Sequence, residues 1–329
     1  MGEFIIETCI KILVVVLVFS FLGGFGTYIE RKVLGYFQRR LGPCYVGPFG
    51  LLQFLADAIK LFTKEDVCPQ HANKAIFMLA PVIAMMSAFV AMAPIPFFGE
   101  FEIFGRTVQP IISDINVGLL FFLAVGAVGI YAPLLAGLSS NSKFSLLGAV
   151  RACIQLLSFE VVSTLSILPP LMLVGSLSLV AMNDYQAGGV FDWLLFQQPL
   201  AFVLFLVASY AELNRTPFDL LEHEAEIVAG FCTEYSGLKW GMFFLAEYAH
   251  LFAFGFVIAL IFCGGYQPLW FIPGGIAIIL KVCFFVFLAM WVRATFPHIR
   301  PDQLMGMCWR VLMPLAIINL LVTSVVILL

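Results

Sequence analysis

The most regular feature of the chain is a series of long apolar stretches separated by short polar segments. A transmembrane helix needs about twenty consecutive apolar residues. Stretches that meet this criterion lie at roughly 4–28, 75–97, 115–138, 152–182, 193–211, 240–262, 272–292 and 311–329. The pattern therefore predicts an all-α polytopic integral membrane protein with about eight transmembrane helices.

The polar segment after the first stretch contains an amphipathic helix of its own. Between residues 50 and 64, the polar residues Gln53, Asp57, Lys60 and Lys64 recur at helical spacing, which puts them on one face. The other face carries Leu51, Leu52, Phe54, Leu55, Ile59 and Phe62. The pattern predicts a helix that lies along the membrane interface or against another subunit, and it equally fits a helix that only anchors the segment.

Composition and charge agree with a membrane protein. The chain is 62% hydrophobic and 11% charged, whereas soluble proteins have about 25% charged residues. Its net charge of -3 and the lack of a long basic run give no indication of nucleic-acid binding. Seven of the 17 lysines and arginines lie between the first two stretches. The positive-inside rule then places segments 29–74 and 212–239 in the cytoplasm and both termini outside, within a single membrane domain, 1–329.

The sequence contains none of the common local motifs for cofactors. No two of the eight cysteines lie fewer than twenty positions apart, so the usual pairs for an iron-sulfur cluster or a structural zinc are missing. Neither glycine-rich nucleotide-binding fingerprint occurs. We expect no metal and no redox cofactor on this chain, and we expect any redox chemistry to come from partner chains.

Ionisable residues occur inside the predicted helices, where each costs about 3 kcal/mol or more. Glu160 lies nine residues after Arg151, and Glu247 is followed by His250 on the same helical face. Lys281 lies within the seventh stretch. These groups indicate either a buried polar path that carries protons or static structural pairs, and spacing alone does not separate the two.

The densest group of charges follows the fifth stretch. Pro217 disfavours an unbroken helix, which predicts a turn near Arg215 and Thr216. Four carboxylates then fall within eight residues, at Asp219, Glu222, Glu224 and Glu226. Asp219, Glu222 and Glu226 share one helical face, so their titrations should be coupled. The pattern fits a solvated acidic loop, but the apolar residues around it favour a loop that packs against something.

Ordered motifs along the whole chain resemble the H subunit (also called subunit 1) of the proton-pumping NADH:quinone oxidoreductase family, respiratory complex I. The motifs are residues 30–47, beginning Glu30, Arg31, Lys32; residues 50–65; residues 142–160, including Gln155 and Glu160; residues 212–237, beginning Glu212, Leu213, Asn214, Arg215, Thr216, Pro217; and residues 291–305, including Arg293. The departures are Phe144 and Phe159 where tyrosine is common, His298 where arginine is usual, and Pro301 after Arg300.

The resemblance implies a subunit at the junction of a hydrophilic arm and a membrane arm, in the cell inner membrane. It implies partners, namely hydrophilic quinone-site subunits that carry flavin and iron-sulfur clusters, and small and antiporter-like membrane subunits, together with quinone as the substrate and membrane lipid. The segments 29–74 and 212–239 would form the wall of a quinone tunnel.

On this resemblance we predict three groups of site residues. The quinone-tunnel wall and coupling loop would comprise Arg31, Arg40, Asp57, Lys60, Arg215, Asp219, Glu222, Glu224, Glu226 and Arg293. A proton relay would run through Glu160, Glu212, Glu234 and Glu247. The quinone tail would contact Phe54, Leu55, Ile59 and Phe62. Two alternatives stay open: the homologous membrane subunit of a hydrogenase-type complex, and a stand-alone secondary transporter.

Overall fold

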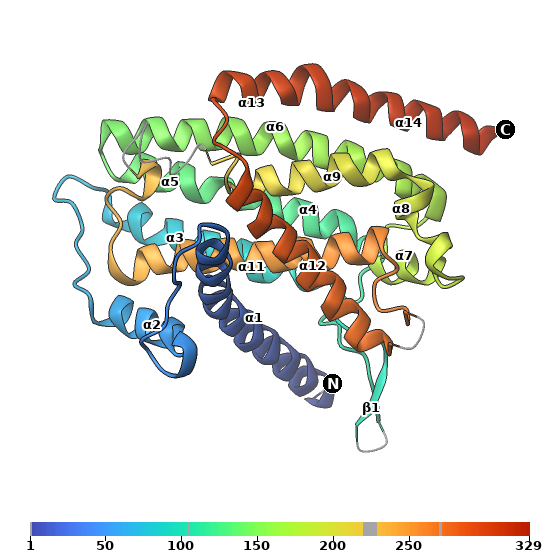
Figure 1. Cartoon of the computed structure of the whole chain (residues 1–329), viewed down its shortest axis with the longest axis horizontal. Coiled ribbons are helices and arrows are strands. Elements are labelled where there is room, and N and C mark those ends of the chain that lie inside the picture. Colours follow the sequence, from blue (N-terminus) through green and yellow to red (C-terminus); the bar gives the residue numbers. More distant parts are fainter. Residues whose placement is uncertain (1, 104–105, 220–228, 270–271) are drawn as a thin grey trace.

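A computed structural model describes residues 2–103, 106–219, 229–269 and 272–329. Seven helices in this part of the chain are long and apolar enough to cross a membrane: Ile5–Phe37, Lys74–Ala91, Gly118–Ser139, Lys143–Val174, Gly237–Phe262, Gly274–Thr295 and Pro301–Leu328. A shorter apolar helix, Pro199–Glu212, lies among them. The predicted all-α polytopic fold is confirmed (Figure 1).

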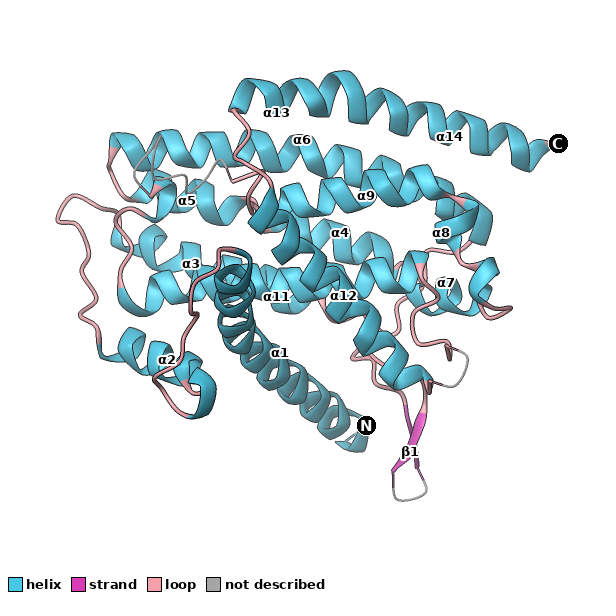
Figure 2. Ribbon diagram, viewed as in Figure 1, coloured by secondary structure: helices cyan, strands magenta, loops and turns pink. Residues whose placement is uncertain are grey.

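The described part of the chain forms a bundle of helices. The helices are α1 (Gly2–Phe37), α2 (Gln53–Thr63), α3 (Lys74–Ala91), α4 (Gly118–Val128), α5 (Tyr131–Ser139), α6 (Lys143–Val174), α7 (Leu179–Tyr185), α8 (Leu194–Gln197), α9 (Pro199–Glu212), α11 (Gly237–Phe262), α12 (Gly274–Thr295), α13 (Pro301–Met307) and α14 (Met313–Leu328). Short 3-10 turns lie at Pro48–Gly50, Val190–Asp192 and Gly230–Cys232, and a π-helical turn lies at Cys308–Leu312. Strands β1 (Phe101–Ile103) and β2 (Arg106–Val108) form an antiparallel hairpin, shown in magenta in Figure 2.

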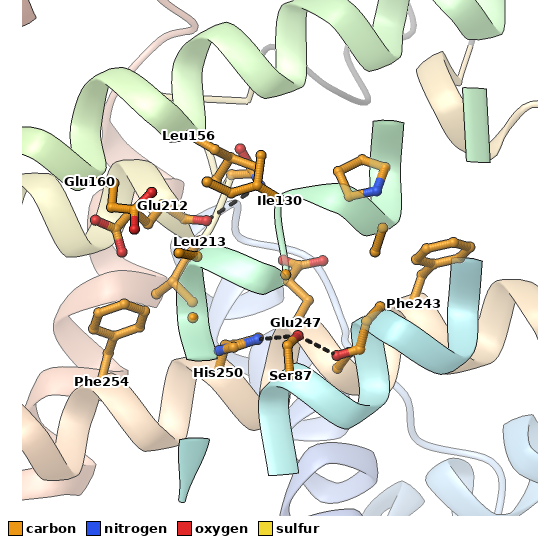
Figure 3. Close-up of a pocket in the computed structure, with 18 of the residues that line it drawn as sticks. Ser87, Ile130, Leu156, Glu160, Glu212, Leu213, Phe243, Glu247, His250 and Phe254 are labelled. Carbon is orange, nitrogen blue, oxygen red and sulfur yellow. Dashed lines mark hydrogen bonds between the residues drawn. The ribbon is translucent and has the colours of Figure 1, made fainter. Parts of the chain in front are cut away.

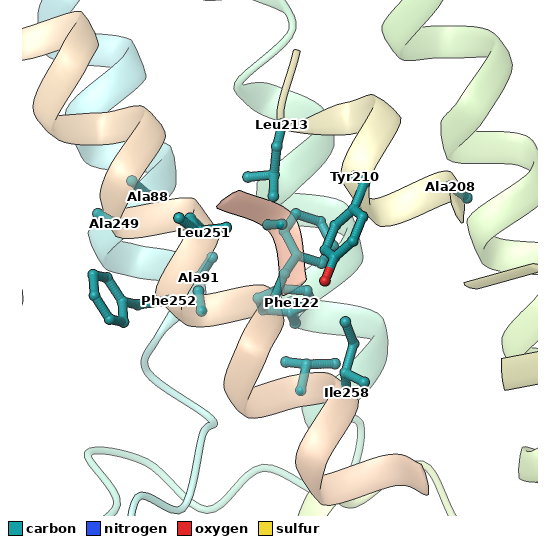
Figure 4. Close-up of a cluster of buried hydrophobic side chains, with 14 of the residues drawn as sticks. Ala88, Ala91, Phe122, Ala208, Tyr210, Leu213, Ala249, Leu251, Phe252 and Ile258 are labelled. Carbon is teal, nitrogen blue, oxygen red and sulfur yellow. The ribbon is translucent and has the colours of Figure 1, made fainter. Parts of the chain in front are cut away.

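Helix α11 is the centre of the bundle. In the most apolar 18-residue stretch of α11, 78% of the residues are buried, whereas in that of α1 only 11% are buried. Helices α1, α3 and α12 all pack against it. Its residues Ala249, Leu251 and Phe252 belong to the buried hydrophobic core, which is drawn in Figure 4 together with residues of α3, α4 and α9. The outer helices therefore present most of their apolar side chains outward, as expected for helices that face lipid.

The two ends of the bundle differ. Helix α2 lies at the left end in Figure 1, whereas α7, α8, the hairpin and the C-terminus lie at the right. At the right end the buried side chain of Gln186 ties the end of α11 in place, since its Nε2 donates to the carbonyls of Leu260 and Ile261, at 3.0 and 2.9 Å. Its Oε1 accepts from the backbone N–H of Gly264 at 2.9 Å.

The predicted boundaries of α1 and α6 were wrong. Helix α1 continues to Phe37 instead of ending near residue 28, because the charged residue Glu30 has buried partners and does not interrupt the helix. Helix α6 begins at Lys143, nine residues before the predicted start, and ends at Val174 with Gly175 in a left-handed conformation. The predicted amphipathic helix is confirmed as α2.

Candidate functional site

A cavity of about 150 Å³ lies inside the bundle, between α3, α4, α5, α6, α9 and α11. Its lining includes three carboxylates from three helices: Glu160 of α6, Glu212 at the end of α9, and Glu247 of α11 (Figure 3). The structure therefore brings together three of the four residues predicted for the proton relay. The carboxylates of Glu160 and Glu212 lie close enough for their charges to interact.

The turn after α9 adds further polar groups to the cavity. Asn214 has a positive φ of 52°, a conformation that asparagine adopts more readily than most residues. Its Oδ1 and the Oε1 of Glu212 are buried and have no hydrogen-bond partner among the described residues.

His250 lines the same cavity one helical turn beyond Glu247. Its Nε2 lies 3.5 Å from Oγ of Ser87 in α3. The hydroxyl of Ser87 already donates its proton to the carbonyl of Ala84 at 2.9 Å. Because its proton is used on Ala84, the Ser87 oxygen can accept from Nε2 of His250 when that nitrogen carries a proton.

A buried ion cluster adjoins the cavity. Arg215 donates from Nη1 to Oε2 of Glu30 at 2.5 Å and from Nε to Oε1 of Glu247 at 2.8 Å. Arg293 of α12 donates to the other oxygen of Glu30. The hydroxyl of Tyr248 also donates to Glu30, at 2.7 Å. Two arginines and two carboxylates thus meet in one cluster.

Electrostatics and packing both hold Arg215 in this cluster. Burial acts to lower the pKa of its guanidinium, but the carboxylates of Glu247 and Glu30 outweigh burial and raise that pKa above its usual value. The guanidinium carbon also lies 4.2 Å from the centre of the Tyr248 ring, a cation–π contact. Arg215 is therefore a permanent charge, and any change of protonation in the cluster falls on its carboxylates.

Glu247 belongs to both features, since it lines the cavity and also accepts from Arg215. The turn between Glu212 and Arg215 joins them a second time, because Glu212 and Asn214 line the cavity. Pro217 follows this turn, as predicted, and Phe218 N donates to Arg215 O at 2.8 Å. The cavity and the ion cluster are therefore one continuous polar region.

The other residues predicted for the tunnel wall and the coupling loop lie either around α2 or after the turn that follows α9. Arg31 and Asp57 form an ion pair at 2.6 Å that holds α2 against the end of α1. Lys60 is exposed on α2, and Arg40 is exposed in the loop before it, where its Nε donates to Gln38 at 2.7 Å. Asp219 is partly buried. Glu222, Glu224 and Glu226 lie outside the described residues.

The four predicted quinone-tail contacts are not equivalent. The ring of Phe54 packs edge-on against Phe21 of α1, with centroids 5.4 Å apart. Leu55, Ile59 and Phe62 are exposed, at 47%, 63% and 74%. Phe54 therefore fixes α2 to α1, and the other three form an open apolar row.

Two ionisable residues lie apart from the cavity. Glu234 precedes α11 and is not among the residues that line the cavity. Lys281 donates to the carbonyl of Gly265 at 2.8 Å and lies 4.6 Å from the centre of the Trp193 ring. The idea that Lys281 shares a polar path with Glu160 and Glu247 was wrong, because α12 presents it near the end of α11.

Sequence reasoning missed Glu30 and Tyr248 as members of the ion cluster. Glu30 was placed just outside the first membrane stretch, although the spacing of Gly23, Gly26 and Glu30 puts all three on one helical face. A Cβ at Gly26 would lie 3.0 Å from the Tyr248 ring, so this face packs closely on α11. A stripe of small residues that ends in a carboxylate was the available signal.

Comparison with known proteins identifies the family. A family model described as NADH dehydrogenase matches residues 10–324. This chain belongs to the NADH dehydrogenase family. Proteins named as the H subunit of NADH-quinone oxidoreductase match it over 100% of both chains: 74% identical in Helicobacter pylori (strain Shi470), 75% in Helicobacter acinonychis (strain Sheeba) and 68% in Wolinella succinogenes. The resemblance inferred from the motifs is confirmed.

Within the described part of this NADH dehydrogenase family member, no group of three or more histidine, cysteine, aspartate or glutamate side chains is arranged to hold a metal ion. The polar region around the cavity contains carboxylates, a histidine and arginines. Such an arrangement can bind, hold and pass protons.

Proposed function

We propose that this chain is the membrane subunit of a proton-translocating NADH:quinone oxidoreductase, and that it couples quinone reduction to proton movement through its cavity. The observation that carries the proposal is the double role of Glu247, which faces the carboxylates of the cavity and accepts from Arg215 of the ion cluster. The names of the full-length relatives support this function over a hydrogenase subunit or a separate transporter.

Coupling would be electrostatic. A unit charge about 6 Å from a carboxylate changes its energy by about 3 kcal/mol at an effective dielectric near 20. A charge change at the quinone, or in the segment of Asp219, Glu222, Glu224 and Glu226, would reach Glu247 through Arg215. Glu247 would then exchange a proton with Glu212 and Glu160, and Glu234 would act at the entrance to this relay.

The tunnel wall would lie on the side of α2. The exposed row Leu55, Ile59 and Phe62 would contact the isoprenoid tail. Arg31 and Asp57 would hold this helix in place, Lys60 and Arg40 would face the partner subunits, and Arg293 would hold Glu30. Phe54 would support the row from behind.

The flavin and iron-sulfur clusters would reside on hydrophilic partner subunits, and further small and antiporter-like membrane subunits would continue the proton path. The chain would lie in the cell inner membrane with both termini on the periplasmic side. The excess of lysine and arginine between the first two spans supports this orientation.

Replacing Glu160 by glutamine tests the relay, because it keeps the size of the side chain and removes its titration. In sealed vesicles, Glu160→Gln is expected to lower quinone reduction and proton pumping together, by about 10-fold or more. Glu7→Gln is the matched control, since Glu7 pairs with Lys11 on an outer face of α1. Unchanged rates in Glu160→Gln would remove this residue from the relay.

The role of the coupling loop, which contains Glu222 and Glu226, is tested by a different measurement. Glu222→Gln and Glu226→Gln are expected to impair quinone reductase activity and to leave electron transfer to an artificial acceptor intact. Loss of both activities would indicate failed assembly.

A further inference from the structure

Gln155 of α6 links this helix to the turn after α9 through its side-chain amide. Its side chain is completely buried. The Nε2 group donates to the carbonyl of Ala211 at 2.9 Å and to the carbonyl of Phe218 at 2.7 Å. Carbonyl oxygens only accept, so the amide must present its NH₂ group to both. One side chain therefore binds the chain at two points seven residues apart.

The segment between these two points carries the polar groups of both halves of the site. Glu212 and Asn214 face the cavity, and Arg215 binds Glu30 and Glu247 in the ion cluster. Ala211 lies in the last turn of α9, where its carbonyl also accepts from Asn214 N at 3.2 Å, and Phe218 follows the turn. Holding both carbonyls fixes the place of the whole turn relative to α6.

Helix α6 holds the chain again just after this region. A Cβ on Gly148 would lie 2.7 Å from Cα of Gly230, so the two backbones touch. Ser145 Oγ donates to the carbonyl of Phe231 at 3.2 Å. Glu160 lies five residues after Gln155 on the same helix. Helix α6 therefore carries the carboxylate of Glu160 and also binds the turn that contains Glu212 and Arg215.

We propose that Gln155 is a positioning residue that sets Glu212 in the cavity and Arg215 in the ion cluster at once, so that the two halves of the site respond together. This inference rests on the function proposed above. Its Oε1 is buried with no hydrogen-bond partner among the described residues. Both donor positions of the amide are therefore used on the turn.

The chain offers a control with the same chemistry. Gln186 is also completely buried and also donates to backbone carbonyls, at the opposite end of α11. Its Oε1 accepts from Leu194 N and Gly264 N, at 3.3 and 2.9 Å. Gln186 is therefore a structural clamp that touches neither the cavity nor the ion cluster.

The test compares Gln155→Leu, Gln186→Leu and Glu212→Gln in the complete complex. The measurements are the amount of complex on native gels, the quinone reductase turnover per assembled complex, and the pH–rate profile. In Gln155→Leu, turnover per complex is expected to fall about 10-fold or more, since a displacement of about 1 Å can cost about 100-fold, and the pH–rate profile is expected to shift. Gln186→Leu is expected to lower only the amount of complex.

Equal behaviour of the two leucine variants, with normal turnover per complex and an unshifted pH profile, would overturn the positioning role. If Gln155→Leu does not assemble, Gln155→Asn decides, because the shorter amide keeps a donor but reaches only one carbonyl; its turnover should fall between wild type and zero with a shifted profile. Failure of both variants to assemble would also overturn the role. Full activity in Glu212→Gln would instead refute the proposed relay, so the two failures are distinguishable.

Discussion

Arg215 donates from Nη1 to Oε2 of Glu30 across 2.5 Å, joining residues 185 positions apart in the sequence. The bond ties the first helix to the turn after α9. Both side chains are almost fully buried, at 5% and 4% exposure. The two residues are therefore mutually dependent, since neither charge has water to replace its partner.

Removal of Arg215 should have the largest effect on stability. Arg215→Met leaves Glu30 and Glu247 without this partner, and loss of one member of a buried ion pair costs about 3–5 kcal/mol. We expect a marked drop in the melting temperature of the purified complex, measured by thermal unfolding. In Arg31→Met, which breaks the partly exposed pair with Asp57, the loss should be about 1 kcal/mol or less. Equal losses in both variants would contradict the buried cluster.

His250 should contribute to proton movement through the cavity. His250→Leu removes the titratable ring beside Glu247 and the contact with Ser87. We expect proton pumping in sealed vesicles to fall by about 10-fold or more. Phe254→Leu is the matched control, because Phe254 lines the same cavity and has no polar atom. Similar losses in both variants would show that only the shape of the cavity matters.

Two substitutions on α2 should distinguish a role in quinone binding, expected for the exposed row, from a role in stability, expected for Phe54. Ile59→Ser should raise KM for a long-tailed quinone by about 5-fold, as about 1 kcal/mol of apolar contact is lost, and should leave KM for a short-tailed analogue unchanged. Phe54→Ser should instead lower the melting temperature, because Phe54 packs against Phe21 and Phe25. An equal rise in KM for both quinones would exclude a tail contact at Ile59.

Cysteine labelling should report the orientation of the chain. Cys44 is exposed in the loop between α1 and α2, whereas Cys232 is buried. An impermeant thiol reagent should label Cys44 in inverted vesicles and not in right-side-out cells, and Cys232 should stay unlabelled in both until the protein is denatured. Labelling of Cys44 in intact cells would reverse the proposed topology.

The hydrophobic pattern predicted most of the fold, because membrane spans are long and composed of apolar residues. It failed where a helix continues through charged residues, as α1 does through Glu30. It also could not show that the third span is two helices, α4 and α5. A hydropathy pattern reports the environment of side chains and carries little information on backbone hydrogen bonds.

The site was predictable in part. Depth in the membrane identified Glu160 and Glu247, and Pro217 located the turn, since each of these depends on local sequence. The pairing of charged residues from different helices does not depend on local sequence, so the partners of Arg215 could not be assigned from the sequence. Lys281 shows the limit clearly: its depth resembled that of Glu247, but its helix presents it to Trp193 and Gly265.

The interruption between α4 and α5 has a consequence for hydration. Around it the backbone bonds tighten to three-residue steps, with Gly129 N donating to Gly126 O at 2.8 Å and Ile130 N to Ala127 O at 3.1 Å. All four residues line the cavity. Irregular backbone at membrane depth is tolerated where it borders water, and the volume suffices for about five water molecules. Water in this cavity would let protons pass between the carboxylates of the proposed relay without direct contact between them.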